Sequence, residues 1–201
     1  MTRLYSHSDA GQAFPIYITV VGGLLLLAFA YLAVGQAAAN RNSAQTAADA
    51  AALAAALDTR DKLTDEWVEN ILDPTKWHDI FYGGGVMFGG CARATQLAAQ
   101  NDASVQCDAH PEWALPGYEV EATTNQSVGD SIVPGTEGKH STERARAVIE
   151  PRCEFELPGT GADPDVLPKL ACDDGIDWPL DPTDLTNLPK PEDLFDVHLA
   201  D

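Results

Sequence analysis

The longest stretch of the chain without a charged side chain covers residues 10–40, which is 31 residues. Its densest part, residues 13–34, consists almost entirely of aliphatic, aromatic and small residues. A helix needs about 20 apolar residues to cross the roughly 30 Å hydrocarbon core of a bilayer. Pro15 stands where a first-turn proline is tolerated, and Tyr17 and Tyr31 stand near the two ends, as interfacial aromatic residues do. The pattern therefore predicts one transmembrane helix over residues 13–34.

A cleaved signal peptide is the main alternative for this segment. Small-x-small sites of the kind that signal peptidases use occur at residues 28–30 and 37–39. However, the apolar run exceeds the 7–15 residues of a signal core, and Arg3 is the only basic side chain that precedes it. These features favour an uncleaved anchor.

Charge divides the chain into two parts. The 201 residues carry a formal net charge of −19, yet acidic and basic residues balance within residues 1–60. The whole excess of acid therefore lies in residues 61–201. Such a surface argues against nucleic-acid binding, which needs clustered Lys and Arg. We expect an apolar anchor followed by an acidic, water-exposed part.

Four cysteines, and no others, all follow the predicted span: Cys91, Cys107, Cys153 and Cys172. An even count outside the membrane indicates two disulfides in an oxidising compartment. Four cysteines allow three pairings, and the sequence does not select one. The flanking Arg residues barely bias the orientation, so the cysteines decide it. We expect a cytoplasmic N-terminus, residues 1–12, and an extracytoplasmic C-terminal part.

An alanine-rich segment over residues 35–60 follows the span. Alanine has the highest helix propensity, and no proline interrupts the run. We therefore predict one helix from about Phe14 to about Leu57, with Asp58-Thr59 as its end. Small residues let another helix approach closely. The candidates for helix packing are Gly22, Gly23, Ala48, Ala51, Ala52 and Ala55; the alternative is that the alanine face lies on the chain's own domain.

The residues on both sides of the span resemble a known family. Asp-Ala-Gly-Gln-Ala-Phe-Pro at residues 9–15, and Gln-Thr-Ala-Ala-Asp-Ala-Ala-Ala-Leu-Ala-Ala-Ala at residues 45–56, are similar to the N-terminal segment of TadE/TadG-like proteins of Tad/Flp pilus assembly. The resemblance covers residues 9–57. It implies a single-pass, pseudopilin-like or pilus-associated protein whose long helix packs with pilin-like helices.

One position departs from the pattern of processed pilins. Their precursors carry a Gly before the cleavage site and a Glu five residues after it. Here Gly11 would be that Gly, but Ile16 occupies the Glu position. The chain therefore resembles the uncleaved TadG-like members more than a processed pilin.

Residues 61–150 predict a small extracytoplasmic α+β domain. A short amphipathic helix is expected over residues 63–72, with Thr64 as its cap, and a second helix over residues 91–100. The alternation of residues 118–124 and 143–150 predicts two antiparallel strands, which face inward at Tyr118, Val120, Ala122, Ala145, Ala147 and Ile149. A shorter strand is expected over residues 103–107. The glycine-rich run over residues 81–91 lacks the Gly-Lys-Ser/Thr of a phosphate-binding loop, so we expect a turn, or a loop that contacts lipid or a partner.

Residues 151–201 hold eight prolines and 13 acidic against three basic residues. This composition predicts an acidic, proline-rich tail that is largely irregular and is tied back by Cys153 and Cys172. The fold class as a whole is α+β, with a short antiparallel sheet, a disulfide-stapled domain and a long N-terminal helix.

No motif in the sequence predicts catalysis, a cofactor or a metal. The acidic run at residues 173–177 lacks the spacing of an EF-hand loop, and Cys107 with His110 lacks the second pair that a zinc site needs. We therefore expect a non-catalytic membrane component whose partners are the membrane and pilus or secretion-system proteins, with self-association included. The alternatives are a freestanding membrane-anchored surface protein and an envelope enzyme.

Overall fold

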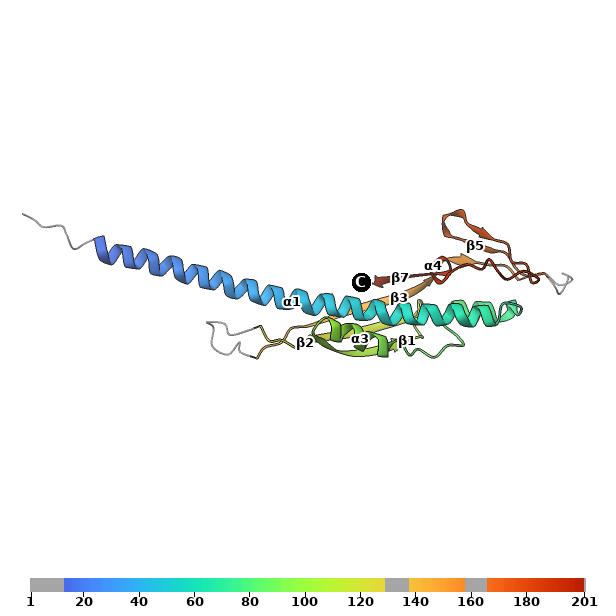
Figure 1. Ribbon diagram of the computed structural model, residues 1–201, viewed down its shortest axis with the longest axis horizontal. Coiled ribbons are helices and arrows are strands. Elements are labelled where there is room, and N and C mark those ends of the chain that lie inside the picture. The colour runs from blue at the N-terminus through green and yellow to red at the C-terminus, as the bar shows by residue number, and fades with distance from the viewer. Residues whose placement is uncertain (1–12, 129–137, 158–165, 201) are drawn as a thin grey trace, which may run out of the picture.

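A computed structural model describes residues 13–128, 138–157 and 166–200 of the chain. One helix, α1, runs from Ala13 to Glu69 and spans 57 residues, about 85 Å at 1.5 Å per residue. Its N-terminal part projects from the molecule, and its C-terminal part runs through the folded domain (Figure 1). The remaining elements gather around this second part. The predicted α+β class and the long N-terminal helix are confirmed.

The main sheet has four antiparallel strands in the order β1-β2-β3-β7. Their bounds are Ala103–His110 for β1, Gly117–Thr124 for β2, Thr142–Pro151 for β3 and Phe195–Ala200 for β7. A smaller antiparallel sheet joins β4, Cys153–Glu154, to β5, Leu170–Cys172, and β5 to β6, Asp177–Trp178. The short helical elements are η1 (Pro74–Lys76), α2 (Trp77–Phe81), α3 (Cys91–Gln100), η2 (Asp173–Gly175) and α4 (Pro191–Leu194).

The core lies between α1, α3 and one face of the main sheet. All six side chains predicted to face inward from β2 and β3 are buried: Tyr118, Val120, Ala122, Ala145, Ala147 and Ile149. The period-2 pattern therefore identified the buried face of both strands. The helix predicted over residues 91–100 is α3, and Asn101 follows its last residue as expected.

The prediction that α1 ends at Asp58-Thr59 is wrong, and so is the separate helix predicted from residue 63. Both polar residues are accommodated inside a continuous helix. Asp58 forms an ion pair with Lys62 at 2.6 Å, one turn further on. The hydroxyl of buried Thr59 bonds the hydroxyl of Tyr118 on β2 at 2.6 Å. Thr64 donates to the carbonyl of Arg60 rather than capping a helix start. The sheet thus supplies the partner that makes a buried threonine tolerable within α1.

The prediction of a largely irregular C-terminal tail is wrong for the last strand. Residues 195–200 form β7, which pairs with β3 from Phe195 opposite Pro151 to Ala200 opposite Arg146. Leu194 and Phe195 are buried in the core, so this end of the chain completes the main sheet. The apolar residues outweigh the proline-rich composition because they find a surface against which to pack.

Two disulfides join the four cysteines. Cys91 at the start of α3 is bonded to Cys107 on β1, and Cys153 on β4 is bonded to Cys172 on β5. The first bond ties the helix layer to the edge of the main sheet, and the second closes the small sheet. Of the three pairings that the sequence allowed, the structure has the one in which both bonds are local.

Candidate functional site: the membrane helix and its neck

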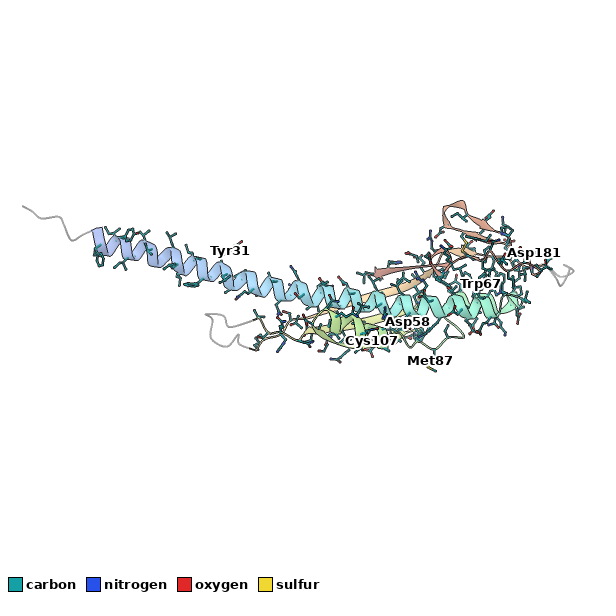
Figure 2. The ribbon with its side chains drawn as sticks, viewed as in Figure 1. Tyr31, Asp58, Trp67, Met87, Cys107 and Asp181 are labelled. Carbon is teal, nitrogen blue, oxygen red and sulfur yellow. A yellow bond between two sulfur atoms is a disulfide. The ribbon has the colours of Figure 1, made fainter. Side chains whose placement is uncertain are left out.

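The N-terminal part of α1 presents apolar side chains without a covering partner. The segment of α1 apolar enough to cross a membrane has none of its most apolar stretch buried within the protein. Its bare surface is evident in Figure 2, where Tyr31 lies well outside the folded domain. The large exposed side chains are Phe14, Ile16, Tyr17, Ile18, Val20, Leu24, Leu25, Leu26, Leu27, Phe29, Tyr31, Leu32 and Val34.

This exposure decides between a core helix and an anchor. A buried apolar side chain gains roughly 1.5–3 kcal/mol relative to an exposed one, so thirteen bare ones would be very costly in water. Lipid or the apolar surface of another membrane helix removes that cost. The segment therefore fits a membrane span and not the core helix of a soluble domain.

Gly22 and Gly23 lie in the middle of the bare segment. A side chain added at either position would meet nothing within 4 Å. The described part of this chain therefore offers no contact that requires glycine at these positions. Their predicted role in packing against another membrane helix stays a prediction.

The alanines of the second half of α1 have a different environment. Ala48, Ala51, Ala52 and Ala55 have no exposed surface, because the sheet and α3 cover them. Gly90, just before α3, comes so close that an added Cβ would lie 2.2 Å from the carbonyl oxygen of Ala55. The structure thus has the alternative arrangement, in which this face of the helix packs on the chain's own domain.

A neck of polar contacts joins α1 to the domain close to the end of the apolar segment. The side-chain amide of Asn40 donates to the carbonyl of Gln126 at 3.0 Å. Its oxygen accepts bonds from the Thr124 hydroxyl and the Ser141 backbone N–H, both at 3.1 Å. Asn40 therefore holds both ends of the β2–β3 connection. It lies six residues after Val34, the last residue of the predicted span, which is about 9 Å along the helix.

The neck continues along α1 with an ion pair and with two hydrogen bonds donated by a side-chain amide. Arg41 pairs with Glu143 of β3 at 2.6 Å. One turn further on, the Gln45 amide donates to Asp49 at 2.7 Å and, at 3.5 Å, to the backbone carbonyl of Arg144. These contacts fix the helix to β3 on both sides of Ala44, its first fully buried residue. The domain cannot rotate freely about the anchor while these contacts persist.

Replacing Asn40 with alanine is expected to loosen this neck. Three hydrogen bonds are lost, each worth about 0.5–1.5 kcal/mol net, although water partly replaces them at this half-buried site. We expect the Ser141 backbone amide to exchange its hydrogen about tenfold faster, measured by hydrogen–deuterium exchange of the full chain in lipid nanodiscs. Asn42→Ala is the matched control, since Asn42 is exposed on the same helix. Equal exchange in the two variants would show that the neck does not hold the domain.

The outer face of the main sheet carries paired charges. Arg144 pairs with Glu121 at 2.5 Å, and Arg146 pairs with Glu119 at 3.2 Å. Arg146 also lies over the ring of Trp113, 4.2 Å from its centroid. Opposite charges on neighbouring strands favour this register of β2 and β3.

The loop after β1 has one perturbed carboxyl group. His110 stacks on Trp113 with the ring centroids 4.1 Å apart, and its Nδ1 lies 2.9 Å from Glu112. The hydrogen bond with His110 is the largest cause that lowers the pKa of the exposed Glu112 carboxyl. Both partners that sequence reasoning considered for zinc are therefore used otherwise: Cys107 in a disulfide and His110 in this stack.

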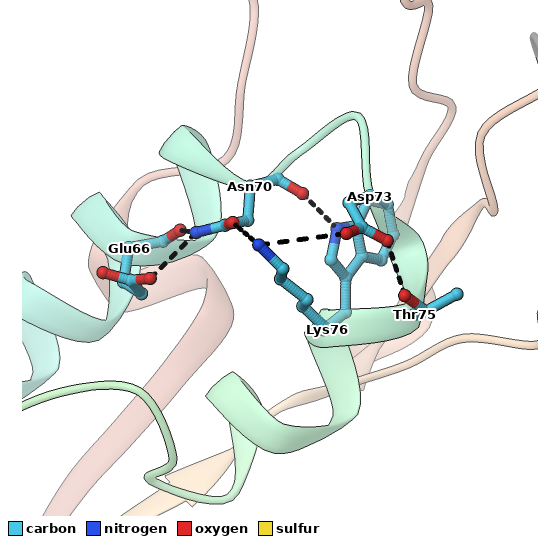
Figure 3. A network of polar contacts seen from close by, with 6 residues as sticks. Glu66, Asn70, Asp73, Thr75 and Lys76 are labelled. Atoms are coloured by element: carbon cyan, nitrogen blue, oxygen red, sulfur yellow. Dashed lines mark hydrogen bonds and ion pairs between the residues drawn. The ribbon is translucent and has the colours of Figure 1, made fainter.

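A network of hydrogen bonds caps the C-terminal end of α1 (Figure 3). Asn70 donates to the carbonyl and the carboxylate of Glu66, and accepts a bond from Lys76 at 2.8 Å. The indole N–H of Trp77 donates to the Asn70 carbonyl at 3.2 Å. These bonds satisfy carbonyl groups that a helix end leaves without partners. They also turn the chain back so that α2 packs against α1.

The glycine-rich loop contains a turn, as predicted. Gly83 and Gly85 have φ values of +88° and +80°, which residues with a side chain rarely adopt. Met87 is 86% exposed at the loop and points away from the domain (Figure 2). Whether this loop contacts lipid or a partner stays a prediction.

Three possible metal ligands meet where β3 and β7 pair. One oxygen or nitrogen atom each of Glu150, Asp196 and His198 lies within 4.8 Å of the others. Sequence reasoning missed this group because its members come from strands far apart in the chain. His198 already bonds Asp196 at 2.9 Å, and both carboxylates are exposed, as solvated acidic groups commonly are.

The acidic residues between β6 and α4 form ordinary turns. The hydroxyl and backbone N–H of Thr183 bond Asp181, and those of Thr186 bond Asp184. In each case the hydroxyl bond is the largest cause that lowers the pKa of the exposed carboxyl group. These carboxylates therefore stabilise the path of the chain and do not form a reactive pair.

The bare span, the neck and the alanine face all lie within one stretch of sequence. The family model described as putative Flp pilus-assembly TadE/G-like matches residues 11–58. The N-terminal segment is therefore similar to TadE/G-like proteins. The match begins at Gly11 and ends within α1, so it includes the whole apolar segment, the neck residues of α1 and the buried alanines.

The resemblance seen in the sequence is thereby confirmed for the N-terminal segment. The remainder of the chain, which builds both sheets and both disulfides, lies outside the match. No curated protein and no solved structure matches the chain significantly.

Proposed function

We propose that the chain is a non-catalytic, single-pass membrane component of a Tad/Flp-type pilus-assembly system. The observation that carries this proposal is the bare apolar half of α1, which coincides with the TadE/G-like match. The same helix continues without a break into the core of the domain. It thus holds that domain at a fixed place next to the membrane.

The proposed orientation has residues 1–12 in the cytoplasm and the domain outside. The two disulfides support it, because such bonds persist in oxidising compartments and are rare in the cytosol. The net charge of −19 is compatible with a solvated outer domain and disfavours nucleic acid as a partner.

The proposed mode of action is lateral packing within the membrane. The alanine face is covered by the chain's own domain, so of the six packing candidates only Gly22 and Gly23 are left uncovered for contact with another helix. Partners of this kind are pilin-like or secretion-system helices, or a second copy of the chain. Close helix approach at small residues is a common basis of association in lipid.

Site-specific photo-crosslinking in native membranes tests this proposal. A photoreactive side chain at Leu26 lies one turn from Gly22 on the same helix face, whereas one at Leu24 points to the opposite face. We expect discrete protein adducts from position 26 and mainly lipid adducts from position 24. Gly22→Leu together with Gly23→Leu is expected to reduce the position 26 adducts at least severalfold.

Two outcomes would contradict the proposal. Protein adducts of equal yield from both positions would show that the glycine face is not a specific contact. Lipid adducts alone from both positions would indicate a freestanding anchored surface protein.

A further inference from the structure

Both outer edges of the main sheet lack a strand partner within the part of the chain that the structure describes. The outermost strands are β1 and β7. Each strand of the sheet runs antiparallel to its neighbour, so β1 and β7 run in opposite directions. Unpaired strand edges are templates for another strand.

The registers show which backbone groups point out from these edges. Antiparallel partners exchange hydrogen bonds at every second residue. The Asn125 N–H bonds the Asp102 carbonyl in line with the β1–β2 register, so even-numbered residues of β1 bond toward β2. The Arg152 N–H bonds the Leu194 carbonyl in line with the β3–β7 register, so even-numbered residues of β7 bond toward β3. The backbone groups of odd-numbered residues therefore point outward, among them those of Cys107, Ala109, Val197 and Leu199.

The two edges carry the same short charge pattern. β1 contains Asp108-Ala-His110, and β7 contains Asp196-Val-His198. The Asp and His residues alternate with the apolar residues that pack against the core. All four charged or ionisable side chains therefore lie on the outer face of the sheet.

These side chains have hydrogen-bonding capacity to spare. Nδ1 of His110 bonds Glu112, and Nδ1 of His198 bonds Asp196, both at 2.9 Å. Within residues 13–128, 138–157 and 166–200, neither Nε2 atom and neither carboxylate oxygen of Asp108 has a hydrogen-bond partner. A protonated imidazole donates from both ring nitrogens, so each edge offers one more N–H and a carboxylate.

Antiparallel pairing of β1 with β7 of another copy matches these groups. In one register the opposite pairs are Cys107 and Leu199, Asp108 and His198, Ala109 and Val197, and His110 and Asp196. Sliding the strands by two residues places either Asp108 opposite Asp196 or His110 opposite His198, and like charges in opposite positions are destabilising. A slide by one residue would exchange the two faces of the sheet. The charges therefore select this register.

The selected register also covers apolar surface. Leu199 is 42% exposed, although it is on the inner side of β7. Opposite Cys107 of another copy, it would lie against the partly buried Val105 and Ala109 on the same side of β1. Burial of apolar surface adds to the backbone hydrogen bonds of the two strands.

This pairing suits copies that are anchored in one membrane. Because β1 and β7 run in opposite directions within each chain, a neighbour with α1 in the same direction presents its β7 antiparallel to β1. Antiparallel pairing of two β1 edges would instead point the two α1 helices in opposite directions. Within one chain His198 is level with His110 across the sheet, so the register needs a stagger of two residues, about 7 Å. A moderate tilt of the strands against the membrane normal accommodates this stagger.

We propose that β1 of one copy binds the β7 edge of a second copy as an antiparallel strand, with Asp108 opposite His198 and His110 opposite Asp196. Such a contact joins two different surfaces, so its repetition arranges copies side by side in a row or ring. The contact is small, and the shared membrane raises the effective concentration of the two edges. The proposal rests on the proposed anchoring by α1, but not on what Gly22 and Gly23 contact.

Photo-crosslinking of the full chain in lipid vesicles tests this inference. A photoreactive side chain replaces Gln106, which the proposed register places opposite Ala200 of the second copy. Equal amounts of ¹⁵N-labelled and unlabelled chains are mixed at about pH 6, where an ordinary histidine is mostly protonated. We expect adducts of mixed isotope composition on residues 195–200. The same probe at Thr123, in the inner strand β2 on the same face, is the matched control and is expected to give few mixed adducts.

An exchange of charges tests the register. His198→Asp and Asp108→His each place like charges opposite each other, so we expect each to lower the yield of mixed adducts about fivefold, the scale of one exposed ion pair. The double variant restores opposite charges and is expected to restore the yield. Damage to the fold by either substitution would not be repaired by the other.

Three results would overturn the inference: no mixed adducts from position 106, equal yields from positions 106 and 123, or a double variant that crosslinks as poorly as the single variants. The adducts from position 106 report the contact between the domains, whereas those from position 26 report the contact of the span. Failure of this inference is therefore distinguishable from failure of the proposed function.

Discussion

Replacing Trp67 with alanine is expected to lower the free energy of unfolding by about 3–5 kcal/mol, the usual cost of removing a fully buried aromatic side chain. Trp67 has no exposed surface, and its ring lies 5.6 Å from that of Trp77 and 6.5 Å from that of Phe81. These edge contacts join the end of α1 to α2. The loss is measured by denaturant unfolding of the full chain in micelles, followed by near-ultraviolet circular dichroism.

Trp67→Phe is the matched control for this variant. The indole N–H of Trp67 has no hydrogen-bond partner within the described residues. Phenylalanine therefore loses volume but breaks no bond, and we expect less than half the cost of the alanine variant. A cost below about 1 kcal/mol for Trp67→Ala would show that the aromatic cluster does not stabilise the fold.

Removal of the Cys91–Cys107 bond by a double alanine substitution is expected to cost about 3 kcal/mol of unfolding free energy. The loops closed by the two disulfides are similar, with sequence separations of 16 and 19 residues. The loop-entropy argument thus predicts nearly equal costs for the two bonds. The positions of the two disulfides, however, predict that different elements loosen when each bond is removed.

The location of each bond decides which part of the molecule loosens. Cys91–Cys107 joins α3 to β1, two elements that cover the core. We expect its loss to speed amide exchange throughout α3 and β1. Cys153–Cys172 joins β4 to β5, so its loss is expected to speed exchange mainly in the small sheet. Mass-spectrometric exchange of the two double variants compares them directly, and identical exchange profiles would contradict this distinction.

Because α1 is continuous, the apolar segment and the core of the domain belong to the same helix. The apolar half is long and apolar enough to cross a membrane, and the other half is the central element of the core. Trp67 and the neck residue Asn40 therefore belong to the same continuous helix. In the proposed assembly, variants that loosen the core would also broaden the orientation of the domain relative to the membrane.

Local patterns in the sequence predicted the elements whose environment is simple. The uncharged run over residues 10–40 predicted a bare apolar helix, because no soluble core absorbs such a segment. Strict alternation predicted the buried faces of β2 and β3, and the TadE/G-like resemblance was read from short strings near the span. Each of these signals depends on neighbouring residues alone.

The same patterns could not identify partners that are distant in sequence. The sequence predicted that the helix ends at Thr59, because it does not show that Tyr118 supplies a hydrogen-bond partner for the Thr59 hydroxyl. The alanines fitted either another protein or the chain's own sheet, since a small side chain suits both. The strand β7 forms because it pairs with residues 146–151 of β3, which are distant from it in the sequence.

The sequence by itself determined that the chain has one apolar segment long enough to span a membrane, a continuing alanine-rich helix and an acidic part that holds all four cysteines. Only the tertiary structure decided where α1 ends, which surface covers its alanines, how the cysteines pair and that the last strand completes the main sheet. The physical reason is the range of the interactions. Hydrophobic length, helix propensity and charge act locally, whereas burial and strand pairing depend on residues that meet only after the chain has folded.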